Sequence, residues 1–131
     1  MSTSTAFKRI RLELARSKEF PNGSQRHGYE FVAPLDRHAH IDATLWNEDR
    51  ERCRVHRFWG DEDEVGQLLH KPGGSEHAHW VFDYDRSTEY DDETGYRFGA
   101  HSFQNGEYVS ISDPNSVSHT FRVVSVTPAA A

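Results

Sequence analysis

The sequence predicts a mainly β fold: a small antiparallel β-barrel or half-open barrel of seven to eight short strands with one short helix. Three observations predict it. Apolar and polar residues alternate with a period of two over many short segments, as in strands with one buried face. Turn-forming runs such as residues 72–75 separate these segments. The apolar residues are largely aromatic, with eight Phe, five Tyr and three Trp against one Met, which suits strand cores.

The expected strands follow one another closely along the chain. In the first of them, Ile10, Leu12 and Leu14 alternate with charged residues. Many short strands with frequent turns favour a sheet that closes on itself, because closure hides strand edges that would otherwise pair between molecules. The other expected strands are residues 27–32, 53–59, 65–71, 77–84, 96–101, 107–112 and 119–126.

One segment, residues 42–52, has helical spacing instead. Asp42 is a good N-cap residue because its carboxylate accepts backbone N–H groups that the first helical turn leaves unpaired. Leu45, Asp49 and Arg52 then follow at intervals of three to four residues. We therefore expect a helix of two to three turns here.

The length and composition predict a single domain, residues 1–131, with flexible tails at about 1–6 and 127–131. Fifteen basic and 21 acidic residues give a net charge of −6, which disfavours general binding to nucleic acid. The lone Cys53 allows no internal disulfide and is expected to be buried. With no signal peptide or membrane-length apolar run, we expect a soluble cytoplasmic protein without a membrane partner.

Nine histidines stand out, and His77 and His79 form one of two His-Ala-His pairs. Residues two apart on a strand point to one face, so such a pair can bind one metal ion. With a four-residue turn at 72–75, His70 opposes His77 and Leu68 opposes His79. The opposite face is apolar and is expected to point inward; it holds Val65, Leu69, Trp80, Phe82 and Tyr84. The predicted ligands of zinc or another divalent transition metal are His70, His77, His79 and Asp83.

The run His77-x-His79 followed by Asp83 resembles the metal motif of cupin barrels, which implies a metal ion inside the barrel. The glycine spacing before it departs from the cupin pattern, and the predicted register puts aromatic residues inside instead. Solvent-facing histidines are therefore the favoured interpretation, and a metal site is the alternative. The whole chain also resembles uncharacterised small proteins of alphaproteobacteria, a bacterial resemblance that implies no activity and no functional residues.

The only basic cluster lies around the start of the expected strand 53–59. Its candidate binding surface consists of Arg52, Arg54, His56 and Trp59. Arginines beside an aromatic ring can hold an anion or the bases of single-stranded nucleic acid. The acidic residues just before them favour ion pairs within the chain instead.

The sequence contains no catalytic or cofactor motif, so we predict no catalytic residue and no cofactor. The favoured function is a non-enzymatic binding or accessory module with an unknown protein or small-molecule partner. One alternative is a metal-binding protein or metal-dependent enzyme that uses the histidines of hairpin 65–84. The other is single-stranded nucleic-acid binding. The sequence leaves open whether the protein forms a homodimer.

Overall fold

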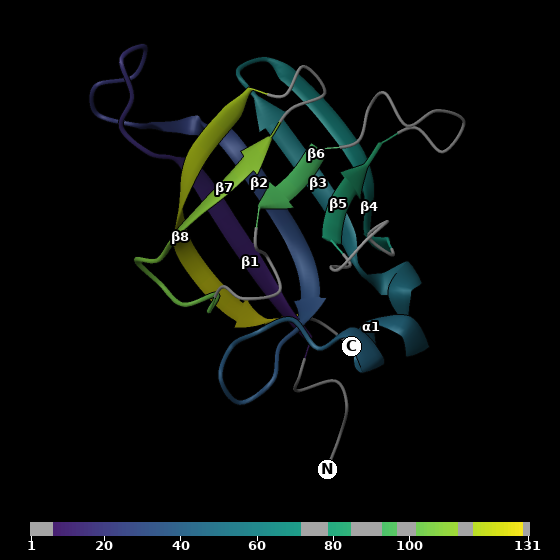
Figure 1. Cartoon of the computed structure of the whole chain (residues 1–131). Helices are drawn as coiled ribbons and strands as arrows, with labels where there is room; N and C mark the ends of the chain where they lie inside the picture. The colour runs from purple at the N-terminus through teal and green to yellow at the C-terminus, as the bar shows by residue number, and fades with distance from the viewer. Residues whose placement is uncertain (1–6, 72–78, 85–92, 97–101, 113–116, 130–131) are drawn as a thin grey trace.

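The computed structural model is a closed barrel of eight antiparallel strands (Figure 1). It describes residues 7–71, 79–84, 93–96, 102–112 and 117–129. Each strand pairs with the next along the chain, and the last pairs with the first, which closes the ring. The predicted mainly β barrel is therefore confirmed. The strands are β1 (Phe7–Leu14), β2 (Ser24–Pro34), β3 (Arg54–Trp59), β4 (Glu62–Lys71), β5 (His79–Asp83), β6 (Glu93–Tyr96), β7 (Tyr108–Ser112) and β8 (Ser118–Pro128).

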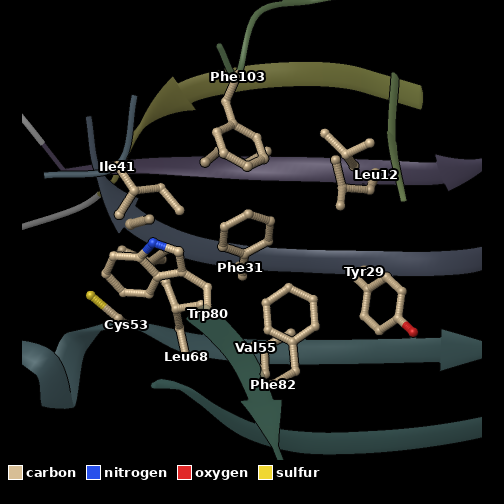
Figure 2. Close-up of a cluster of buried hydrophobic side chains, with 14 of the residues drawn as sticks. Leu12, Tyr29, Phe31, Ile41, Cys53, Val55, Leu68, Trp80, Phe82 and Phe103 are labelled. Atoms are coloured by element: carbon tan, nitrogen blue, oxygen red, sulfur yellow. The ribbon is translucent and has the colours of Figure 1, made fainter. Parts of the chain in front are cut away.

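The interior of the barrel is a packed aromatic core (Figure 2). The period-two pattern of β1 is confirmed, since Ile10 and Leu12 are fully buried and pair with Phe31 and Tyr29 of β2. The Phe31 ring lies 5.2 Å from that of Phe82. An eight-stranded barrel is just wide enough for side chains to fill. Its middle is therefore a core, and room for a ligand must be sought at its ends.

One end of the barrel is covered by a short helix, α1 (Ala43–Glu48), where β1 starts and β8 ends (Figure 1). The predicted N-cap is confirmed, because the Leu45 N–H donates to Asp42 Oδ1 at 3.1 Å. Trp46 is the buried residue of this helix. The predicted helix 42–52 does not continue, however: α1 ends at Glu48, and a 3-10 turn, η2 (Arg50–Arg52), follows. Residues 48–52 are all charged and offer no apolar face to bury against the barrel.

The carboxyl-terminal segment differs from the expected flexible tail at 127–131. β8 continues to Pro128, which pairs with Lys8 of β1. Beyond it, the Ala129 N–H donates to the Phe7 carbonyl at 2.9 Å, and Ala129 is buried. The backbone groups of β1 need partners along their whole length, and this segment supplies them. Residues 1–6 and 130–131 lie outside the described residues.

Several strand bounds differ from the predictions, among them that of β2, which covers Ser24–Pro34 rather than 27–32. β4 begins at Glu62, because the chain turns at Gly60, whose φ of +64° suits glycine, before the acidic run. β6 covers Glu93–Tyr96, whereas the predicted strand 96–101 lies almost entirely outside the described residues. Within the described part of the chain, no helix has the length and apolar character needed to cross a membrane.

Candidate functional site

The register of the β4–β5 hairpin differs from the predicted one. His70 pairs with Trp80 and Lys71 with His79, so the predicted pairing of His70 with His77 is wrong. The two strands are separated by residues 72–78 rather than by a four-residue turn. The pairing of Leu68 with Phe82, both fully buried, aligns the apolar faces of the two strands. The His70 ring stacks on Trp80, with centroids 4.1 Å apart.

This register changes the predicted metal site. Asp83 pairs with Gln67, so it lies on the face of the sheet opposite to His70, and one ion cannot bind both. Val65 and Leu69 were expected to point inward, but both lie on the outward face, and Val65 is 54% exposed. Trp80 and Phe82 point inward, as predicted. His77 lies outside the described residues, and His79 is described only by its backbone. Within the described residues, no three His, Cys, Asp or Glu side chains are grouped to hold a metal ion.

The four residues of the predicted basic surface do not lie together in the structure. The Arg52 guanidinium lies over the Phe7 ring at 4.3 Å and 3.5 Å from Asp49, beside the helix. Arg54 and His56 are exposed on the outer face of β3, where His56 Nε2 lies 2.8 Å from Asp63 Oδ1. The Arg52–Asp49 contact agrees with the expected ion pairing, whereas His56 contacts an acidic residue of β4 instead.

Trp59, the fourth residue of that predicted surface, lies on the inner face of β3, at the end of the barrel opposite α1. It pairs there with His27 of β2, and the two rings meet edge to face with centroids 4.8 Å apart. On its other side, the His119 ring of β8 lies 5.7 Å from Trp59. Phe20, from the loop between β1 and β2, stacks 4.7 Å from His27. We call Phe20, His27, Trp59 and His119 the barrel-end cluster.

The barrel-end cluster continues the aromatic core toward solvent. Trp59 lies 6.4 Å from Phe121, which in turn contacts Tyr29 at 5.1 Å. Arg57, also on the inner face of β3, places its guanidinium 4.6 Å from the Trp59 ring centroid, with its Nε atom buried. The site therefore combines flat apolar surfaces with polar and cationic groups, and all its rings are half-buried.

A cavity of about 190 Å³ lies between this cluster and the β1–β2 loop. Larger hollows of about 520 and 480 Å³ open elsewhere, but exposed polar side chains such as Arg16, Gln25 and Arg37 make up much of their lining. Trp59 and His119 of the inner face of the barrel border the smaller cavity. It is lined by Leu14, Ser17, Lys18, Glu19, Phe20, Trp59 and His119.

His27 is held in place by a hydrogen bond to Ser24. Its Nδ1 lies 2.7 Å from the Ser24 hydroxyl oxygen, which also accepts the Arg26 N–H at 3.2 Å. The hydroxyl can donate to Nδ1 or accept from it, so this bond suits either tautomer of the neutral ring. Burial, followed by the positive charges of Arg26 and Arg57, lowers the pKa of His27 below its ordinary value. His27 is therefore neutral at pH 7.

Trp59 is the one residue of the barrel-end cluster that was predicted from the sequence to lie on a binding surface. The sequence pattern could also have indicated His27 and His119. His27 lies two residues before the buried Tyr29, and His119 lies two residues before the buried Phe121, so each shares the inward face of its strand. What the sequence did not contain was the register that brings the two histidines to Trp59. No protein-family model, curated protein or solved structure matches this chain.

Proposed function

We propose that this protein is a non-enzymatic binding module that holds a small planar molecule at the open end of its barrel. The observation that carries the proposal is the position of Trp59. Its ring is flanked by His27 and His119 and borders the cavity together with Phe20. Aromatic side chains on concave surfaces, with a few polar groups among them, are typical of small-molecule sites.

The size of the cavity limits the ligand. An apolar cavity of about 150 Å³ accommodates a benzene ring. The cavity here, about 190 Å³, therefore suits one ring or a small fused pair. Because the middle of the barrel is filled by side chains, a longer ligand would have to extend outward, past the β1–β2 loop.

The lining also indicates how a ligand would be oriented. Phe20 and Trp59 offer ring surfaces for stacking, and His119 offers a ring nitrogen for one hydrogen bond. Lys18 and Glu19 bring one charge of each sign to the rim. This favours a flat heteroaromatic molecule with both donors and acceptors over a strongly charged one. The single Cys53 supports a reducing compartment such as the cytoplasm for this module.

The proposal is tested by ligand-observed and protein-observed NMR with two fragment sets of equal size, one planar and heteroaromatic, the other saturated. We expect planar fragments to bind with millimolar or better affinity and to shift the Trp59 indole resonance. Trp59→Leu should weaken binding about tenfold, since stacking on one aromatic ring contributes roughly 1–3 kcal/mol.

The matched control is Tyr108→Ala, which removes a 56% exposed aromatic ring from the outer face of β7 and should leave binding unchanged. If neither fragment set shifts Trp59, or if Trp59→Leu and Tyr108→Ala weaken binding equally, the barrel end is not the site.

A further inference from the structure

The β1–β2 loop covers the cavity through Phe20, and the Phe20 ring rests against His27. We propose that His27 is a pH-sensitive latch: neutral His27 keeps Phe20 in place and the cavity closed, and protonation of His27 releases the loop. The inference rests on the proposed function in that it describes the regulation of the same site.

The loop is built to move as one piece. The Ser17 and Gly23 N–H groups both donate to the Phe20 carbonyl at 2.9 Å, and the Phe20 N–H donates to Ser17 Oγ at 3.1 Å. These bonds stay within the loop and would survive its displacement. At its start, the Ala15 N–H donates to the Thr120 carbonyl of β8 at 3.0 Å. At its end, Gly23 has a φ of +74°, which glycine adopts without strain, and it lies close to the Leu14 carbonyl.

Phe20 holds the loop against the barrel: its side chain packs on the core cluster, and its ring lies 4.7 Å from that of His27, centroid to centroid. His27 is in turn fixed to Ser24 on one side and to the Trp59 ring on the other. Any change in the charge of His27 acts directly on the surface against which Phe20 packs.

Charged groups from several elements lie near His27 and affect its protonation. Arg26 and Arg57 both disfavour a positive charge on its ring, and Asp61 holds Arg26 at 2.9 Å. Glu62, at the start of β4, pairs with Trp59, and His119 lies beyond Trp59. The loop itself carries the remaining charged groups near the cavity, Lys18 and Glu19.

Burial also disfavours protonation of His27, and opening of the loop exposes the ring to water. Once the ring is exposed to water, the lowering of the pKa of His27 that burial causes is relieved, so this pKa rises toward its ordinary value. The open state thus binds a proton more tightly than the closed state, so a fall in pH shifts the population toward the open state. Arg26 and Arg57 lie on β2 and β3 and stay beside His27 in both states, so the shift comes from the burial that loop opening removes, against the attraction of an imidazolium to the Phe20 ring.

The test is acrylamide quenching of tryptophan fluorescence lifetimes in the ligand-free protein between pH 8.0 and 5.0. Trp46 and Trp80 are buried, at 5% and 3% exposure, so the accessible signal comes from Trp59. We expect the bimolecular quenching constant of Trp59 to rise about threefold as the pH falls through a midpoint below 6.5. Circular dichroism recorded on the same samples defines the pH range in which the barrel stays folded.

His27→Phe keeps a ring against Phe20 but cannot be protonated, so its quenching constant should stay low at every pH. Phe20→Ala removes the cover and should give a high constant at every pH. His119→Phe, the matched control for the second histidine beside Trp59, should keep the wild-type pH dependence. The latch is overturned if wild-type quenching does not change with pH, or if the change persists in His27→Phe.

These results are independent of the ligand. If the fragment screen fails but quenching follows the predicted pattern, the latch stands and the proposed function falls. If planar fragments bind at Trp59 with rates that are the same at pH 8.0 and 5.5, the function stands and the latch falls.

Discussion

The indole N–H of Trp46 donates to the Leu68 carbonyl oxygen at 2.9 Å, which ties helix α1 to strand β4. The Trp46 ring also meets Trp80 edge to face, with centroids 5.4 Å apart. These two contacts fix α1 against the end of the barrel opposite Trp59.

Trp46→Phe should lower the free energy of unfolding by about 1–3 kcal/mol, because it leaves a buried carbonyl without its donor and a small void. Urea denaturation followed by circular dichroism measures this change. Tyr108→Phe, which alters an exposed ring, should stay within about 0.5 kcal/mol of the wild type. Equal effects of the two substitutions would contradict the role of this hydrogen bond.

The protein should be more stable with glycine in place of Ala39. It is the one non-glycine residue in the described part of the chain with a positive φ, +64°, a conformation that costs an L-residue roughly 1–2 kcal/mol. It is held there because Asp36 accepts the His38 and His40 N–H groups and the Phe103 N–H donates to the Ala39 carbonyl. Ala39→Gly should raise the free energy of unfolding by about 0.5–1 kcal/mol, after the entropy that glycine loses on folding.

Ala43→Gly provides the control, since Ala43 is the first residue of α1, where the backbone is helical. There the same change should lower the free energy of unfolding by about 0.5–1 kcal/mol. Both variants are compared by thermal and urea denaturation. A loss of stability in Ala39→Gly would show that the strain is relieved in solution by some other means.

Cys53 should be unreactive in the native protein, as its predicted burial implies. Its side chain has no exposed surface, and burial raises its pKa to about 12, with a smaller contribution from Asp49. Only the thiolate attacks a disulfide reagent, so at pH 8 the folded protein offers neither access nor the reactive form. Labelling by an aromatic disulfide should be more than a hundredfold slower in buffer than in denaturing urea. Labelling at the unfolded rate in buffer would place Cys53 outside the core.

The metal alternative has a direct test. Untagged protein, purified without a metal column, is analysed for bound elements beside the variant His77→Ala/His79→Ala. We expect less than about a tenth of an equivalent of zinc, iron or nickel in both samples. Stoichiometric metal that disappears in the variant would instead establish a site at His77 and His79 and replace the proposed function.

The sequence by itself determined what depends on neighbours in the chain. The alternation in β1, the inward position of Trp80 and Phe82, the Asp42 cap and the burial of Cys53 all follow from local periods or local hydrogen bonds. These features are fixed within a few residues, because the pleat of a strand and the first turn of a helix are themselves local.

Only the tertiary structure decided which strands meet at which residues. The β4–β5 register depended on the length of the connection and on the pairing of Leu68 with Phe82. In this register His70 lies on the inward face and stacks on Trp80. The barrel-end cluster joins His27, Trp59 and His119, which lie far apart in the sequence. Local pattern gives the face of each residue, but its height along the barrel is set by pairing across strands, and that pairing creates the site.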